Sequence, residues 1–296
     1  MEFAVATFNL KDFFLPRTEA HEPLGRTKLE NVAALLREAN AHVLLLQEVG
    51  EEEGLRQLLP RIGWENPSLL IGRPDHRGIR CAIVSLFPFE RADAVEARSL
   101  AFPKFNVEDA EPFADVIPMR RPLLRAEVRI GSERVTFLTG HFKSQLPAPL
   151  KEAGNAKLLL TPMDWADAMV RSLVQRIAEA RKLRALIEEA SSISSWVVAG
   201  GDFNDVPSSV PIAVLLSGAP EARMVDLAAA HCPHAHSVLH RGAPARIDYV
   251  LASPALAARA IEVRVLNETL RDHGPHDPSA PPQPDSDHAP IVARFS

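Results

Sequence analysis

The sequence predicts an α/β protein with a mixed β-sheet, and three observations carry this prediction. Short apolar segments alternate with segments of helical periodicity along the whole chain. Residues 123–130 and 134–140 are typical of an antiparallel hairpin, so part of the sheet is expected to be antiparallel. With 46% hydrophobic and 24% charged residues among 296, the composition is that of an ordinary globular protein.

The first third of the chain contains three strand candidates and one helix candidate. Residues 2–8 and 80–86 are apolar segments of strand length, and the apolar run 42–49 is a strand candidate that ends in polar residues. Residues 27–39 predict a helix with Thr27 as its N-cap. The apolar face of this helix is formed by Leu29, Val32, Ala33 and Leu36.

The remaining elements follow the same alternation. Apolar and charged residues alternate in 123–130, which is the period of a half-buried strand, and Gly131-Ser132 leads into 134–140. Residues 164–189 predict a long helix whose charged residues face solvent. Its core-facing stripe is expected to contain Met169, Leu173, Val174, Ile177, Leu183 and Leu186. Further strands are expected at 196–200, 246–252, 261–266 and 290–295.

Two long loops interrupt the pattern, at about 144–163 and 271–287. Six prolines fall within residues 271–290, which excludes regular structure there. The sequence has no internal repeat and no clear linker, so we expect residues 1–296 to form a single domain. Loops of this length in a compact domain are usually functional or mobile.

Charge and composition exclude several classes of protein. No apolar run approaches the roughly 18 residues of a membrane span, so we expect no membrane segment. The N-terminus lacks a signal-peptide pattern, and two cysteines, Cys81 and Cys232, are too few for a disulfide framework. We therefore expect a cytoplasmic protein. The net charge of −5 argues against nucleic-acid binding by bulk charge alone, but not against an enzyme that brings a metal ion to a phosphate.

Polar residues at the ends of the predicted strands are the most informative feature. One strand after another ends in, or lies beside, a residue that can bind metal or phosphate. These residues are Asn9, Glu48, His141, Lys143, Ser144, Asp202, Asn204, Asp248, Asp287 and His288. Carboxylates and an amide without soft ligands suit Mg²⁺ or Mn²⁺, and histidines supply proton transfer or hydrogen bonds to a phosphoryl oxygen. Together they are the components of metal-assisted phosphoester hydrolysis.

Six motifs, TFNL, LLQEV, LTGHFKS, GGDFND, RIDYVL and SDHAPIV, occur in this order between residues 7 and 292. Their order and strand-end positions resemble the endonuclease/exonuclease/phosphatase superfamily typified by deoxyribonuclease I. The resemblance covers nearly the whole chain. It implies a four-layer α/β sandwich of two packed mixed β-sheets flanked by helices, and a metal-dependent phosphoester hydrolase.

The resemblance also implies roles for individual residues. Glu48 would be the principal Mg²⁺ ligand, with Asn9 nearby and Asp287 in the metal shell. Asp202 and Asn204 would orient the attacking water and the scissile phosphate.

The two histidines take complementary roles in the same scheme. His288 would contact the phosphate or act as general base, held by Asp248. His141 would lie opposite and donate to the phosphate or protonate the leaving group. The sequence leaves open which of the two accepts the proton of the water.

This chain departs from the family pattern in two places. In deoxyribonuclease I the histidine that matches His141 has a glutamate partner, whereas residues 78–85 offer only Arg80. Apurinic-site nucleases have a tyrosine at the position of His141, and the only tyrosine here is Tyr249. The second departure argues against a dedicated abasic-site nuclease.

Several residues are expected to bind substrate or have a simpler explanation. Arg121, Lys143 and His236 are candidate substrate contacts, although Lys143 could equally extend to solvent. Asn residues at strand ends are common turn-formers, which is the simpler explanation for Asn9 and Asn204. The HCPHAH segment at 231–236 superficially resembles a soft-metal site, but its spacing fits no usual zinc pattern, and a loop at the rim of the site is favoured.

Three functions are compatible with the sequence. The first is a Mg²⁺-dependent phosphodiesterase, a nuclease acting on DNA or RNA. The second is a phosphomonoesterase, or a hydrolase of phospholipid or inositol-phosphate headgroups. The third, a non-catalytic binding module, is disfavoured because none of the metal or histidine positions has been lost. The oligomeric state cannot be inferred from the sequence.

Overall fold

The computed structural model describes residues 1–113, 116–152, 155–219, 223–274 and 283–296. One six-stranded sheet has the order β15 (Ala260–Val265), β16 (Ile291–Phe295), β1 (Phe3–Phe13), β2 (Val43–Val49), β4 (Arg80–Ser85), β3 (Ser68–Ile71). A second has the order β11 (Val225–Asp226), β14 (Asp248–Ala252), β10 (Trp196–Asp202), β7 (Glu133–His141), β6 (Leu123–Ile130), β5 (Phe89–Val95). Two small hairpins pair β12 (Val238–His240) with β13 (Ala243–Ala245), and β8 (Lys151–Glu152) with β9 (Asn155–Ala156).

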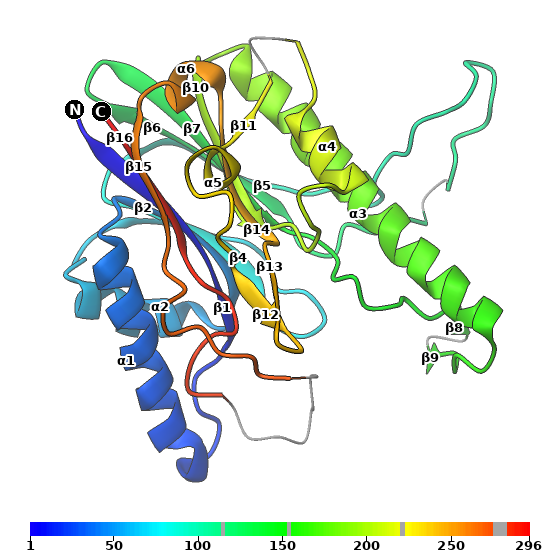
Figure 1. The fold of residues 1–296 in the computed structure, drawn as a ribbon, viewed down its shortest axis with the longest axis horizontal. Coiled ribbons are helices and arrows are strands. Elements are labelled where there is room, and N and C mark those ends of the chain that lie inside the picture. Colours follow the sequence, from blue (N-terminus) through cyan, green and yellow to red (C-terminus); the bar gives the residue numbers. More distant parts are fainter. Residues whose placement is uncertain (114–115, 153–154, 220–222, 275–282) are drawn as a thin grey trace.

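The helices connect these strands, and the two longest cover the outer faces of the sheets (Figure 1). The α-helices are α1 (Glu22–Ala39), α2 (Glu52–Leu58), α3 (Pro162–Ser191), α4 (Val210–Leu216), α5 (Leu227–His231) and α6 (Pro254–Ala257), with short 3-10 turns η1 (Glu19–His21) and η2 (Leu59–Ile62). Helix α1 joins the parallel strands β1 and β2, and α3 joins the parallel strands β7 and β10. The other ladders are antiparallel, so both sheets are mixed, as the sequence predicts.

The alternating side chains of each strand build a four-layer structure. In β1, Phe3 and Val5 face the second sheet and join Phe137 and Val198 in the central core. The intervening residues of β1 face the other way, where Phe8 packs in the same cluster as the apolar face of α1. On the outside of the second sheet, α3 packs against β7 and β10. The order helix, sheet, sheet, helix is the predicted four-layer α/β sandwich.

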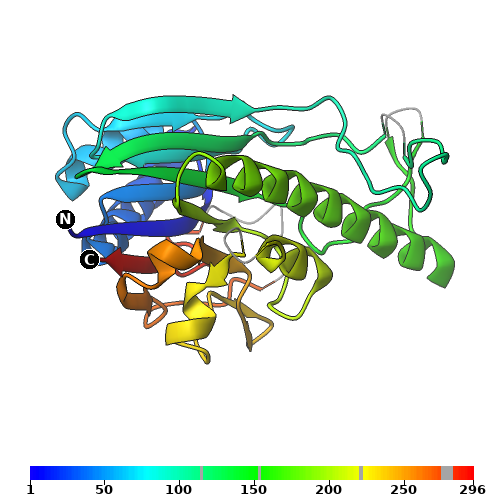
Figure 2. The same cartoon turned by 90° about the horizontal axis from the view of Figure 1, so that it is seen from above.

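The ends of the chain lie side by side because β1 and β16 are antiparallel neighbours (Figures 1 and 2). Phe3 is aligned with Phe295, and their rings stack at a centroid distance of 5.0 Å. This pairing brings residues near both ends of the sequence into one sheet.

Helix α1 begins earlier than the sequence predicts. Its first residue is Glu22, and Pro23 lies in the first turn, where a missing backbone N–H costs little. Thr27 is therefore inside the helix and does not cap it, since its Oγ1 donates to the Pro23 carbonyl at 3.0 Å. The expected cap was wrong because Pro23 starts the helix one turn before the apolar stripe becomes visible.

Helix α3 is confirmed in place, but its predicted faces are partly wrong. The N-terminal part of α3 extends beyond both sheets (Figures 1 and 2), and Met169 and Leu173 are exposed rather than in the core. Leu183 and Leu186, nearer the C-terminus, are buried. Conversely, some charged residues expected to face solvent are buried; Arg176 is one of them. An ion pair with Asp205 at 2.8 Å explains its burial.

The two predicted long loops have different outcomes. Segment 144–163 contains the short hairpin β8–β9 and ends in the first turn of α3, which Thr161 caps. Segment 271–287 lies partly outside the described residues, at 275–282. Within the described ranges, no helix is long and apolar enough to cross a membrane.

Gly201 provides a test of the β10–β7 pairing. Its φ is +153°, and a Cβ there would lie 2.1 Å from the Gly140 carbonyl oxygen in the neighbouring strand. We predict that Gly201→Ala lowers the free energy of unfolding by about 3 kcal/mol or more in urea denaturation, because the strands must separate. Gly131→Ala is the matched control, with φ +64° but no atom within 4 Å, and should cost only about 1 kcal/mol. Equal losses in both variants would contradict the steric argument.

Candidate active site

The strand register brings the polar strand-end residues together at one end of the two sheets. Asp202, the last residue of β10, is aligned with His141 at the end of β7 and with Asp248 at the start of β14. In the first sheet, Asn9 of β1 is aligned with the residue that precedes Glu48 in β2. Ordinary ladder pairing therefore decides which of these side chains become neighbours.

Asp202 lies at the centre of the group and is only 2% exposed. Its Oδ2 accepts a hydrogen bond of 2.9 Å from Asn9 Nδ2, which joins the two sheets across the site. Its Oδ1 accepts from the backbone N–H of Asn204 at 2.9 Å. His141 Nε2 lies 3.4 Å from Oδ2. The carboxylate is thus held from three different directions.

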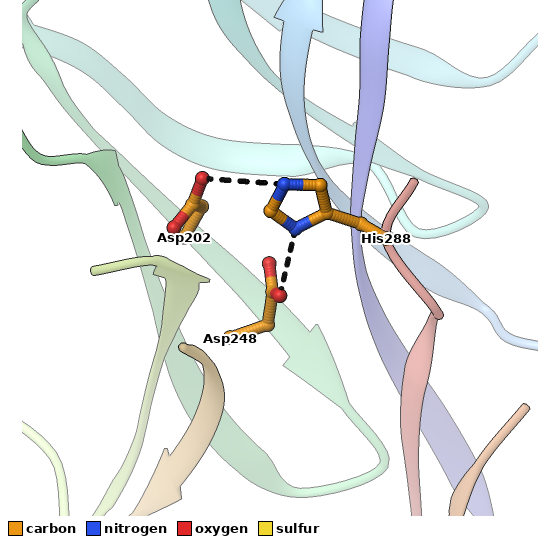
Figure 3. A group of neighbouring side chains, drawn as sticks. All are labelled: Asp202, Asp248 and His288. Atoms are coloured by element: carbon orange, nitrogen blue, oxygen red, sulfur yellow. Dashed lines mark hydrogen bonds and ion pairs between the residues drawn. The ribbon is translucent and has the colours of Figure 1, made fainter. Parts of the chain in front are cut away.

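His288 and Asp248 form a buried pair beside Asp202 (Figure 3). His288 Nδ1 and Asp248 Oδ2 are 2.9 Å apart, and His288 Nε2 lies 3.9 Å from Asp202 Oδ2. Possible ligand atoms of these three residues all lie within 4.8 Å of one another, the one such group of His, Cys, Asp or Glu in the described ranges. The backbone N–H of His288 donates to Ser286 Oγ, which itself donates to the Asn9 carbonyl.

Glu48 and Asn204 adopt left-handed backbone conformations, with φ of 55° and 54°. This conformation is costly for residues with a Cβ and is retained where the surroundings determine it. Glu48 Oε2 accepts from the backbone N–H of Asp12 at 2.9 Å, and Oε1 lies 3.9 Å from His141 Nε2. Asn204 Nδ2 donates to the Phe142 carbonyl at 3.0 Å. The strained backbone turns Glu48 toward the second sheet.

Two basic side chains that the sequence prediction missed contact the acidic residues. Lys11 Nζ lies 3.0 Å from Asp287 Oδ2, and Arg77 lies 3.6 Å from Glu48 Oε2 and 2.6 Å from Asp12 Oδ1. Lys11 comes directly after the first motif, two residues beyond Asn9, so its position was a usable signal. Arg77 comes from the loop between β3 and β4 and had no such signal.

The surroundings shift the pKa values of the two histidines in opposite directions. Burial disfavours the charged form of His288, but Asp248, Asp202 and Asp287 outweigh it and raise its pKa to about 10. Burial, together with positive neighbours such as Arg121, holds the pKa of His141 well below its ordinary value. His288 is therefore protonated and His141 neutral near pH 7.

Asp202 also has a shifted pKa. Burial, reinforced by the negative charge of Asp248, raises the pKa of Asp202 to about 7. His141 Nε2 is the ring nitrogen that faces the carboxyl groups of Asp202 and Glu48.

Several buried polar atoms of the site have no hydrogen-bond partner in the part of the chain that the structure describes. They include Asp248 Oδ1, Asp287 Oδ1 and His141 Nδ1. Buried polar atoms are normally paired, so unpaired oxygens at one site are typical of a place that receives a cation or substrate. Carboxylate oxygens with an amide nearby match the ligands of a hard divalent cation. The residues present therefore fit such an ion.

The three predicted substrate-binding residues point their polar atoms elsewhere. Arg121 pairs with Asp75 at 2.7 Å and donates to the carbonyls of His141 and Phe142, so it positions the end of β7. Lys143 Nζ donates to the carbonyls of Ser144 and Leu146 and to Ser144 Oγ.

His236 precedes Ser237, whose Oγ accepts from the backbone N–H of Asp248 and whose carbonyl accepts from that of Ala289. The ring and carbonyl of His236 contact Asn267 at 3.3 and 2.9 Å. His231 is the last residue of α5, and Cys232 to His236 follow it outside any helix or strand.

The sequence matches the model of the Endonuclease/Exonuclease/phosphatase family over residues 6–288. No curated protein matches the sequence significantly. Among solved structures, the fold is similar to truncated TDP2 of Caenorhabditis elegans, with TM-score 0.63, 19% identity and coverage of 99% of this chain and 97% of that one.

Two further structures have the same fold. An AP endonuclease from Archaeoglobus fulgidus gives TM-score 0.58 at 18% identity, with 99% of each chain covered. A variant of the 3′ phosphatase NExo from Neisseria, bound to a product DNA hairpin, gives TM-score 0.62 at 19% identity, again with 99% of each chain covered. At these identities the likeness concerns the fold.

The high pKa of His288 can be tested directly. We predict that Asp248→Asn lowers the pKa of His288 by at least about one unit in an NMR titration of its imidazole with a chelator present, because the closest negative charge is removed. Because the pKa of His288 is raised in the folded state, its protonated side chain stabilises the fold fully below pH 6.5, and this contribution is lost as the pH rises toward 10. Between these pH values the free energy of unfolding should therefore fall more in the wild type than in Asp248→Asn.

Asp167→Asn, on the exposed part of α3, is the control and should leave the pKa of His288 unchanged. If the pKa of His288 in Asp248→Asn equals that of the wild type, the carboxylate is not its cause.

Proposed function

The chain belongs to the endonuclease/exonuclease/phosphatase family and is a phosphoester hydrolase; we propose that its whole length forms one Mg²⁺-dependent phosphodiesterase domain that acts on nucleic acid. The observation that carries this proposal is the buried group of Asp202, Asp248 and His288, with Asn9 and His141 beside it. It combines acidic oxygens with two histidines of opposite protonation state.

We assign the metal shell to Glu48, Asn9 and Asp287. The unpaired Asp287 Oδ1 and the oxygen-rich surroundings support this assignment. When bound, Mg²⁺ or Mn²⁺ would polarise the phosphoryl oxygens and neutralise developing negative charge. Lys11 pairs with Asp287, and Arg77 lies near Glu48. Two carboxylates of the proposed metal shell therefore already face positive charge.

His288 and Asp248 act as a unit in this proposal. Asp248 holds Nδ1, which leaves Nε2 directed toward Asp202 and Asp287. The protonated imidazole can donate to a phosphate oxygen, and its high pKa makes it the stronger base of the two histidines once the proton has left. Asp202 and Asn204 position the water and the phosphate beside it.

His141 acts from the opposite side of Asp202 as a neutral donor. Its low pKa keeps the ring neutral, so its N–H can donate a hydrogen bond to a phosphate or leaving-group oxygen. Arg121 holds the backbone of His141 through its carbonyl, so it has a positioning role.

A nucleic-acid substrate is supported by the Neisseria 3′ phosphatase, which was solved with product DNA. The same structure favours a second candidate, phosphomonoesterase activity, since that protein is a 3′ phosphatase. A substrate panel separates the two functions: a monoesterase releases inorganic phosphate from a terminally phosphorylated oligonucleotide, whereas a diesterase shortens the strand.

Metal binding is tested with Glu48. We predict that Glu48→Gln weakens Mg²⁺ or Mn²⁺ affinity at least about tenfold in isothermal titration calorimetry, because one charged ligand is lost. Glu53→Gln, an exposed glutamate of α2, should bind the metal like the wild type. Equal affinity in Glu48→Gln and wild type would remove Glu48 from the metal shell.

Catalysis is tested with His288 and Asp202. We predict that His288→Asn and Asp202→Asn each lower kcat on a DNA or RNA oligonucleotide by about 10²–10⁴-fold, because proton transfer and positioning are lost. EDTA should abolish the wild-type activity and added Mg²⁺ restore it. His234→Asn, an exposed histidine of HCPHAH, serves as control and should remain active. Metal-independent, equal rates in all four proteins would refute the proposed function.

A further inference from the structure

A cavity of about 450 Å³ lies outside the catalytic group, on the side of His141. Three segments form its walls: 73–76 from the β3–β4 loop, 118–120 before β6, and 143–149 after β7. Prolines in all three segments limit the freedom of the backbone there, so the cavity is a shaped feature of the surface.

The cavity is basic. Arg73, His76, Arg120 and Lys143 line it, and Asp75 is the one acidic residue among the described residues of its wall. The Asp75 side chain is 1% exposed and pairs with Arg121 at 2.7 Å, so it offers no negative charge to the cavity.

Arg120 is the cation best placed to bind a ligand. Arg73 pairs with Glu96 at 2.9 Å, and Lys143 Nζ is saturated by loop oxygens. In contrast, the Arg120 guanidinium has no hydrogen bond or ion pair with any described residue. Burial, followed by the positive charges of Arg120 and Arg176, lowers the pKa of Lys143 to about 8.

The cavity shares a wall with the catalytic group. Arg121, next to Arg120, binds Asp75 of the cavity wall and the carbonyl of His141. The same β3–β4 loop carries Arg77 to within 3.6 Å of Glu48. The Arg121–Asp75 pair and the β3–β4 loop therefore link the cavity wall to the catalytic group.

We propose that this basic cavity binds a second phosphate group of an extended substrate strand and that Arg120 is the residue that contacts it. The inference rests on the proposed nucleic-acid phosphodiesterase and names a specificity-determining residue for it. A guanidinium can bind phosphate with two hydrogen bonds, which favours this ligand over a neutral group. Substrates with a single phosphate group cannot use the cavity.

The test compares two substrates in Arg120→Gln: a single-stranded oligonucleotide and bis(p-nitrophenyl) phosphate, which has one phosphate group. We expect the ratio of kcat/KM for the oligonucleotide to kcat/KM for the small diester to fall about tenfold, mainly through KM of the oligonucleotide. Arg120→Lys, which keeps the charge, should recover part of the loss. Arg129→Gln, at the opposite end of β6, removes an exposed arginine and should leave the ratio unchanged.

A binding measurement separates this inference from the proposed function. Fluorescence anisotropy of a labelled oligonucleotide, with a chelator present, should show weaker binding by Arg120→Gln and a log Kd–log salt slope smaller by about one. If the wild type hydrolyses neither substrate, the proposed function fails, and the binding measurement still decides the role of the cavity. An affinity and a substrate ratio within about twofold of the wild type would overturn the inference.

Discussion

The buried carboxylate of Asp202 is the group on which the arrangement of this site depends. A carboxylate removed from water costs several kcal/mol unless it is paired. Asp202 meets this requirement with Asn9 from the other sheet, the Asn204 backbone and His141. Because its partners come from different elements, the carboxylate can remain buried only when both sheets are packed in register. Folding of the sandwich and assembly of the site are thus the same event.

The same burial explains why two histidines a few ångströms from one carboxylate differ in charge. His288 has Asp248 at 2.9 Å as well as Asp202, and the sum of these negative charges outweighs desolvation. His141 lies near Arg121 and keeps an unpartnered Nδ1 among the described residues, so desolvation prevails. Where the surroundings move the pKa values of two neighbouring titratable groups apart, the two groups can take different roles in acid–base chemistry. Here the carboxylates around His288, Asp248 foremost, and the burial of His141 beside Arg121 together account for the separation.

The convergence of the polar strand-end residues could be predicted from the sequence because it follows from local rules. Polar residues after apolar strands are visible in the sequence, and strand ends gather at one edge once the ladders form. The surrounding contacts depend on tertiary packing that no local pattern encodes. Asn9 and Asp202, for example, are 193 residues apart in the sequence. The pairing of Arg121 with Asp75 could not be predicted because it depends on where the β3–β4 loop lies in the fold.

Helix α3 illustrates the same limit within one element. Its apolar periodicity continues past the edge of the sheets, so periodicity alone could not reveal where its core-facing stripe ends. The buried Arg176 was equally invisible, because its partner Asp205 belongs to another segment. Whether a helix forms depends on its local sequence, whereas how much of its apolar face is buried depends on the length of the sheet that it packs against.

The distribution of charge explains how an acidic protein can act on phosphate. The net charge of −5 counts carboxylates that lie inside the site, such as Asp248 and Asp287, where they are matched by His288 and Lys11. Outside that group, the surface on the side of His141 is basic. Interactions beyond about 10 Å are screened at ordinary salt, so a polyanion responds to this local field rather than to the total. Some of the acids that make the chain negative are therefore offset by cations within the site, and total charge is a poor guide to how the chain meets phosphate.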